Sequence, residues 1–169
     1  MMQITPSFRS PSVRRSASLL SSVALALTTV LFVAGPAEAV TKISHSHAAG
    51  HFSDAGITWS SSGNCSDRYN STCTSFEQIN HETVDGVITL KRASGCSINI
   101  TGGTETGHAS GTYSHWNGYK VDISKYTCVG NYIRNNFSYI GGSKWRAPSG
   151  NIYYDEVSHW DITYYTCGC

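Results

Sequence analysis

The stretch Ser75–Ser94, SFEQINHETVDGVITLKRAS, decides the fold class that the sequence predicts. It opens with the S-x-x-Q pattern of a capping box, in which two side chains satisfy backbone groups at the start of a helix. Apolar and β-branched residues then recur at helical spacing until Gly95. They are Phe76, Ile79, Thr83, Val84, Val87, Ile88 and Leu90. The sequence therefore predicts a helix from about Ser75 to Ser94.

Short segments rich in aromatic and β-branched residues come after this helix, as is typical of antiparallel strands. We expect strands at Ser97–Thr101, Tyr119–Ile123, Lys144–Ala147, Asn151–Asp155 and Trp160–Tyr165. A short helix, capped by Ser124, is expected at 124–135. The predicted fold class is α+β, with a helix packed on a small antiparallel sheet.

The N-terminal residues have the pattern of a secretory signal peptide. Arg9, Arg14 and Arg15 precede an apolar run at 19–34, and Ala37-Glu38-Ala39 has the form of a cleavage site. We expect 1–39 to be removed and the chain to be secreted, by a route that the sequence leaves open. The apolar run is short and rich in Ser and Thr, so we expect no membrane span.

Residues 40–62 are predicted to be a flexible N-terminal segment, and 63–169 the folded domain. The segment is small and polar, and His45, His47 and His51 lie within it. Mobility is the interpretation that we prefer for a new N-terminus, and adventitious binding of a metal by the histidines is the alternative.

Composition narrows the classes of partner. Without the leader, 9 Lys and Arg residues stand against 10 Asp and Glu residues, a net charge of −1. This balance does not favour a nucleic-acid partner, and we expect a monomer. Six cysteines lie after the leader and could form up to three disulfides. Among the 15 possible pairings we favour only a local Cys65–Cys73 bond.

The stretch Ser114–Asp122, SHWNGYKVD, places His115 and Asp122 seven residues apart around Asn117-Gly118. Along one uninterrupted strand, residues seven apart point to opposite faces. A two-residue hairpin turn at Asn117-Gly118 would instead bring His115 and Asp122 to the same face. A looser loop carrying His115 toward Asp122 would serve equally well. The pair is therefore a candidate for half of a metal site.

A second stretch, Asp155–Asp161, DEVSHWD, could complete that site. It contains His159, with Glu156 three residues earlier. A catalytic zinc needs three protein ligands and an open position for water, and a nearby glutamate can accept the proton of that water. Spacing alone does not separate this hypothesis from chance in a chain with seven histidines.

The two stretches together resemble a known family. S-H-x-x-G-x-x-x-D at 114–122, followed by E-x-x-H-W at 156–160, is similar to the zinc D-Ala-D-Ala carboxypeptidases and the phage L-alanoyl-D-glutamate endolysins. These enzymes share the hedgehog/DD-peptidase fold, and the resemblance implies that fold and a peptidoglycan substrate. It also implies zinc ligands His115, Asp122 and His159, and the general base Glu156.

The chain departs from the family pattern in two places. Lys120 stands where the family has a small residue, and 101–105 lacks the arginine that holds the substrate carbonyl or carboxylate. Arg68, Lys120 or His108 could replace that arginine, although a loop histidine is also commonly solvent-exposed. Trp116 and Trp160 could bind substrate beside the ligands, or pack in the core. Asp161 could orient a ligand histidine or lie exposed.

Three functions follow as hypotheses. The first is a secreted zinc metallopeptidase, of D,D-carboxypeptidase or L,D-endopeptidase type, that hydrolyses an amide bond in a D-amino-acid-containing peptidoglycan peptide. The second is a non-catalytic secreted binding module of the same fold with a structural metal. The third is a disulfide-stapled secreted protein without a metal.

Overall fold

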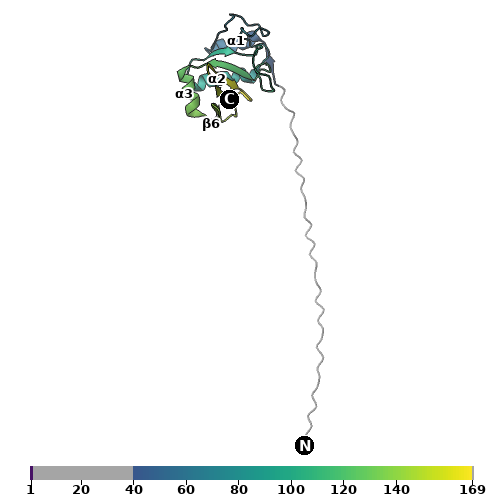
Figure 1. Cartoon of the computed structure of the whole chain (residues 1–169), viewed down its shortest axis with the longest axis vertical. Helices are drawn as coiled ribbons and strands as arrows, with labels where there is room; N and C mark the ends of the chain where they lie inside the picture. The colour runs from purple at the N-terminus through teal and green to yellow at the C-terminus, as the bar shows by residue number, and fades with distance from the viewer. Residues whose placement is uncertain (2–39, 169) are drawn as a thin grey trace. The chain divides into compact units, whose positions relative to one another are not determined.

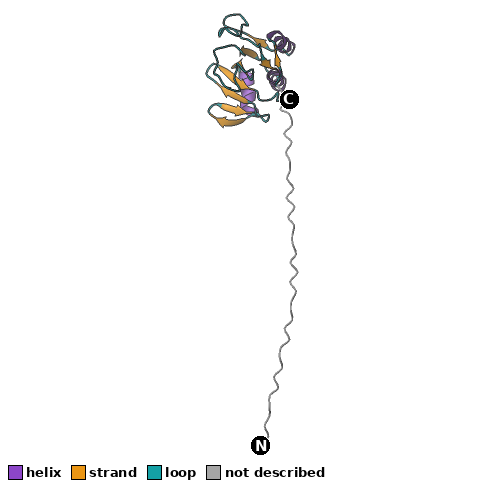
Figure 2. Ribbon diagram, turned by 90° about the vertical axis from the view of Figure 1, so that its right-hand side faces the viewer, coloured by secondary structure: helices purple, strands orange, loops and turns teal. Residues whose placement is uncertain are grey.

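The computed structural model describes Met1 and residues 40–168 of the 169-residue chain. The described residues 40–168 form three helices and nine strands, and Figure 1 and Figure 2 show how these elements are arranged. The predicted signal peptide, 1–39, falls almost wholly outside the described residues. In the described part of the chain, no helix is long and apolar enough to cross a membrane.

The α+β class is confirmed, but the sheet is larger than expected. Seven strands lie in the order β2-β4-β5-β9-β8-β7-β6. Neighbouring strands are antiparallel except for β2 and β4, which run parallel. The strands are β2 Thr58–Trp59, β4 Asn99–Gly102, β5 Lys120–Ser124, β6 Ser138–Gly141, β7 Lys144–Arg146, β8 Ile152–Asp155 and β9 His159–Thr163. The sheet is therefore mixed, because β2 at its edge is parallel to β4. Strand β2 comes from the segment that we predicted to be flexible.

The predicted helix begins six residues later than expected, as α2, His81–Ser94. Gln78 has a left-handed φ of 63°, which turns the chain, and the Ser75 hydroxyl accepts from the Glu77 N–H instead of capping a helix. The short strand β3, Ile79–Asn80, then precedes the helix. The helix ends as predicted at Gly95, whose φ of 65° suits a residue without a Cβ.

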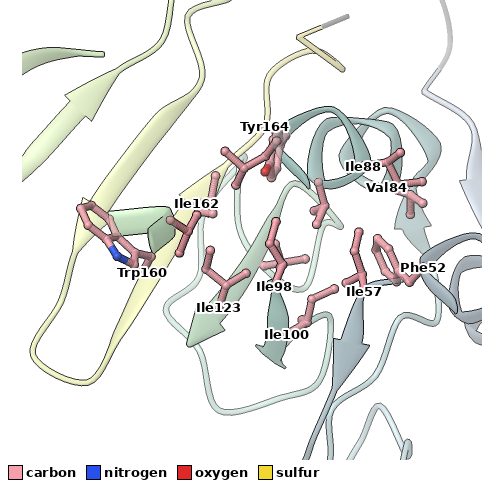
Figure 3. Close-up of a cluster of buried hydrophobic side chains, with 14 of the residues drawn as sticks. Phe52, Ile57, Val84, Ile88, Ile98, Ile100, Ile123, Trp160, Ile162 and Tyr164 are labelled. Atoms are coloured by element: carbon pink, nitrogen blue, oxygen red, sulfur yellow. The ribbon is translucent and has the colours of Figure 1, made fainter. Parts of the chain in front are cut away.

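One face of the sheet packs into the hydrophobic core. Ile123 of β5 and Ile162 of β9 are fully buried there (Figure 3). Gly86 of α2 packs so closely that an added Cβ would lie 2.3 Å from the ring of Tyr164. Trp160 belongs to this face and is only 1% exposed, so of the two alternatives considered for it, substrate binding and core packing, the structure shows core packing. Residues alternate between faces along a strand, and the opposite face therefore carries Asp122 and its neighbours.

The N-terminal segment 40–62 contains regular structure, contrary to the prediction of a flexible segment. Strand β1, Lys42–Ile43, pairs with β3, and helix α1 spans His45–Asp54. The Ser44 hydroxyl caps the helix by accepting from the His47 N–H. Ala48 and Phe52, one turn apart, are completely buried. Burial of this narrow apolar stripe attaches an otherwise polar helix to the domain.

Two disulfides among the described residues stabilise the domain. The predicted Cys65–Cys73 bond is confirmed, and Cys96–Cys128 is a further bond. Cys96 follows α2 and Cys128 lies in the first turn of α3, Thr127–Asn136. The second bond therefore connects the end of α2 to the start of α3 through two cysteines 32 residues apart in sequence. Disulfides of this kind are consistent with an extracellular protein.

Candidate metal centre

The residues of the two sequence motifs meet at the open face of the sheet. Asp122 lies on β5 and His159 on the adjacent strand β9, while His115 comes from the loop before β5. His115 Nε2 and His159 Nε2 lie 3.3 and 3.4 Å from the same oxygen, Asp122 Oδ1. Glu156 Oε2 lies 3.1 Å from His159 Nε2. Strand pairing thus brings together segments 37 residues apart in sequence, from Asp122 to His159.

A loop, and not the predicted hairpin, carries His115 to Asp122. The Gly118 N–H donates to the His115 carbonyl at 2.8 Å, and the Tyr119 N–H donates to the Ser114 carbonyl at 3.1 Å. The chain folds back on itself here, while β5 pairs with β4 and β9. The looser of the two geometries that we considered is therefore the one that forms.

Asp122 Oδ1 is a buried carboxylate oxygen without a hydrogen-bond partner among the described residues. The two imidazole nitrogens face it, yet neither makes a well-aligned hydrogen bond with it. An unsatisfied buried charge is costly. Carboxylate and imidazole donors that converge without bonding to one another are the arrangement expected of ligands to one cation.

The backbone fixes the orientation of His115. Its Nδ1 lies 2.7 Å from the Gly103 carbonyl and donates to it, because a carbonyl can only accept. When the ring is neutral, Nε2 therefore carries the lone pair, and Nε2 faces Asp122. A hydrogen bond from the second nitrogen to a carbonyl is the usual way in which proteins orient a metal-ligating histidine.

His108 is the residue that the structure adds most clearly to the centre. Its ring stacks on that of His115, with centroids 3.8 Å apart and planes 14° apart. Its Nε2 lies 3.0 Å from Glu105 Oε1, and its Nδ1 lies 3.7 Å from Asp122 Oδ2. The ligand atoms of His108, His115 and Asp122 all lie within 4.8 Å of one another. These three residues could hold a metal ion, and His159 borders the same carboxylate.

Glu105 supports the centre and was not predicted from the sequence. It is only 2% exposed, and it accepts from the backbone N–H groups of Ser75 and Gly103 as well as from His108. Burial raises the pKa of the Glu105 carboxyl group, but these hydrogen bonds lower the pKa by more than burial raises it. The net pKa therefore lies below the ordinary value. Glu105 and His108 repeat the E-x-x-H spacing of Glu156 and His159, which is the signal that could have revealed the pair.

Two carboxylates control the charge of His115. Burial lowers its pKa, but Asp122 and Asp161 together raise it to about 9. Asp161 Oδ2 lies 3.9 Å from His115 Nε2 and 2.8 Å from Lys120 Nζ. Burial raises the pKa of Asp161, and His115 and Lys120 lower it to a net value below the ordinary one. The Asp161 carboxylate therefore lies beside the candidate ligand His115 and forms an ion pair with Lys120.

Gly102 makes room for the centre at the end of β4. A Cβ at this position would lie 2.6 Å from Asp122 Oδ2 and 3.1 Å from the His108 ring. At Gly103, an added Cβ would lie 2.0 Å from the Ser75 carbonyl oxygen. The resembled family has an arginine in this region, whereas here a side chain would meet those of Asp122 and His108 at Gly102 and the Ser75 backbone at Gly103.

A cavity of about 300 Å³ opens over the centre, and Glu156, Lys120 and Ala109 complete its lining. Trp116 lies beside it, 42% exposed, in the wall of an adjoining pocket that also includes His108. The Arg68 guanidinium stacks on the Trp116 ring at 3.8 Å and donates to the Thr104 carbonyl. Trp116 thus lies beside the cavity and not in the core, and Arg68 holds the loop through its contacts with Trp116 and Thr104.

Comparison of the chain with protein-family models, with curated proteins and with solved structures returned no match. The chemistry of the centre is therefore inferred from its own residues.

Proposed function

We propose that the protein is a secreted zinc-dependent peptidase of the hedgehog/DD-peptidase type, which hydrolyses an amide bond in a peptidoglycan peptide containing a D-amino acid. The observation that carries the proposal is the convergence of His115 and His159 on the unsatisfied oxygen of Asp122. We assign these three residues as the zinc ligands. The signal-peptide pattern and the two disulfides support export.

A bound zinc ion would lower the pKa of a water molecule and polarise the scissile carbonyl. Glu156 is the candidate general base, because its carboxylate is 35% exposed at the cavity and lies next to His159. It would take the proton of the attacking water and pass it to the leaving amine. Its position at the turn between β8 and β9 lets it face the cavity without belonging to the buried carboxylate cluster.

His108 is the candidate replacement for the arginine of the resembled family. Glu105 would hold one imidazole nitrogen, and the other would be directed to the centre, where it could donate to a developing oxyanion when protonated. In this role His108 contacts substrate and is not required as a ligand. The proposal therefore predicts that His108→Gln keeps zinc and lowers kcat, whereas His159→Gln loses zinc.

The face of the sheet beside the cavity suits a substrate with a carboxylate. Asp122, Asp161, Tyr154 and Lys144 lie in one cross-strand row. Three strand spacings, about 14 Å in all, separate Lys144 at one end of this row from Asp122 at the other. Arg146 is two residues further along β7, on the same face of the sheet as Lys144, and its guanidinium has no ion-pair partner among the described residues. Peptidoglycan stems carry free carboxylates, which these cations could bind.

Replacing Glu156 by Gln tests the proposal. The variant keeps the size of the side chain but cannot accept a proton, so hydrolysis should fall by about 100-fold or more, the usual contribution of a general base. Zinc content should not change, because Glu156 is not an assigned ligand. Asp67→Asn, a change at an exposed loop carboxylate, is the matched control. Full activity in Glu156→Gln would remove this residue from the mechanism.

A second candidate is a non-catalytic binding module of the same fold with a structural metal. One observation favours it: His108 offers a third nitrogen, and so a fourth ligand, close to Asp122, and four protein ligands would close the coordination shell. In that case His108→Gln should lower zinc affinity as strongly as His159→Gln does. Elemental analysis of the two variants after dialysis distinguishes a catalytic centre from a closed structural one.

A further inference from the structure

Three histidines on two packed helices form a separate cluster, remote in sequence from the centre described above. His47 and His51 lie one turn apart on α1, and His81 is the first residue of α2. The rings of His47 and His51 have centroids 4.8 Å apart, and those of His51 and His81 have centroids 5.8 Å apart. His47 is exposed, and His51 and His81 are half-buried.

These separations match the dimensions of a metal site. With metal to nitrogen bonds of about 2.0 to 2.1 Å, two imidazoles bound to one tetrahedral ion have centroids about 5 Å apart. The nitrogens do not yet share one coordination shell, and the rings would reach it by rotating about their side-chain torsions. His47 is exposed, and the rings of His51 and His81 are only partly covered, which leaves them an open side toward which to rotate.

His81 already has the carboxylate partner that ligand histidines commonly have. Its Nδ1 lies 3.2 Å from Asp85 Oδ2, one helical turn further along α2. A carboxylate that binds one imidazole nitrogen leaves the other nitrogen as a donor, and increases its basicity toward a metal. Asp85 would therefore be a positioning residue for His81.

The scaffold beneath the cluster is fixed. Ala48 and Phe52 of α1 and Val84 of α2 are completely buried in the same core, and Figure 3 draws Phe52 and Val84 within it. The distance between the two helix backbones is thus set by packing. His45, on the same helix, is directed elsewhere, since its Nδ1 accepts from the Phe76 N–H at 2.9 Å and its ring stacks on Phe76.

We propose that His47, His51 and His81 form a second, solvent-accessible site for a divalent transition-metal ion, with Asp85 positioning His81. Three imidazoles favour ions of the Zn²⁺, Ni²⁺ and Cu²⁺ group over Ca²⁺ or Mg²⁺. Water or another ligand would complete the shell at the exposed side. The bound ion would join α1 to the N-terminus of α2 and stabilise the attachment of the N-terminal helix.

Zinc titration of chelator-stripped protein by calorimetry tests this site independently of any peptidase activity. The background variant is His115→Gln, which removes an assigned ligand of the first centre. This variant should still bind one equivalent of Zn²⁺ and gain thermal stability from it. Adding His51→Gln or His81→Gln should abolish both effects. Adding Asp85→Asn should weaken binding by about 10-fold or more, the usual effect of losing the carboxylate partner of a ligand histidine.

Asp54→Asn is the matched control, because Asp54 is an exposed carboxylate at the end of the same helix, and it should leave the titration unchanged. Circular dichroism of each variant before titration checks that it is folded. The proposal is overturned if the His115→Gln protein binds no zinc. It is also overturned if its bound equivalent persists after both His51→Gln and His81→Gln, or if Asp54→Asn weakens binding as much as they do.

Discussion

Removal of metal should expose a pH-dependent contribution of His115 to stability. In the metal-free protein, Asp122 and Asp161 raise the pKa of this buried imidazole from the ordinary 6.5 to about 9. A raised pKa in the folded state means that the folded protein binds the proton more tightly than the unfolded chain does. The stabilisation is therefore fully present below pH 6.5, and it is lost as the pH rises through about 9.

The size of the effect follows from the two pKa values. Each pKa unit corresponds to about 1.4 kcal/mol, so the protonated His115 contributes about 3 kcal/mol to the free energy of unfolding. The comparison is between chelator-stripped wild type and His115→Gln, which can still donate to the Gly103 carbonyl. Urea denaturation at several pH values, followed by tryptophan fluorescence, gives both free energies. Their difference should fall by about 3 kcal/mol between pH 6 and pH 10.

Saturating zinc should reverse this dependence, because the metal binds the neutral imidazole and competes with the proton. The zinc affinity of the wild type should therefore rise with pH until about pH 9. A difference between wild type and His115→Gln that stays constant with pH would refute the idea that the carboxylates hold a proton on His115. Zinc affinity that is independent of pH would refute the competition.

Three further predictions concern residues around the centre. Gly102→Ala should lower zinc affinity about 10-fold or more by displacing the Asp122 carboxylate, as measured by competition with a chromophoric chelator; unchanged affinity would mean that the carboxylate has room to move. Arg134 and Lys125 outweigh burial and lower the pKa of Asp155, so stability should be lost as the pH falls below 3.8. Asp155→Asn should reduce this loss of stability at low pH, as measured by thermal melts at several pH values. An equal loss in the variant and the wild type would contradict the prediction. Arg146→Gln should raise KM roughly 3-fold to 10-fold for a stem peptide with a free carboxylate but not for its amide, and equal KM changes for both peptides would remove the sheet face from substrate binding.

Much of the fold was predictable because periodic burial leaves a pattern in the sequence. The strands after Gly95 are short, and aromatic and β-branched residues alternate along them, as a sheet with one buried face requires. The helix start was not predictable from the S-x-x-Q signature at Ser75. The Ser75 hydroxyl accepts a hydrogen bond from the Glu77 N–H within a local turn, and Gln78 has a left-handed conformation. Neither feature can be predicted from helical spacing. Helix α1 was missed because Ala48 and Phe52 are its only two fully buried residues.

The candidate centre was predicted in part. Motif spacing selected His115, Asp122 and His159, and the structure brings all three together. The E-x-x-H spacing could have paired Glu105 with His108, but not its contacts with the backbone at Ser75 and Gly103, which only the folded chain brings near it. For Trp160 the sequence left core packing and substrate binding open, because the face of β9 on which it lies depends on the register with β5.

Incubation of the purified protein with defined muropeptides, with and without a chelator, tests the central claim most directly. Mass spectrometry then identifies any product, and the account predicts cleavage at one amide bond that stops with the chelator and returns with added zinc. Release of D-alanine would assign a carboxypeptidase, and a cut within the stem would assign an endopeptidase. Muropeptides that stay intact in the zinc-loaded protein, or cleavage that is indifferent to the chelator, would contradict the account.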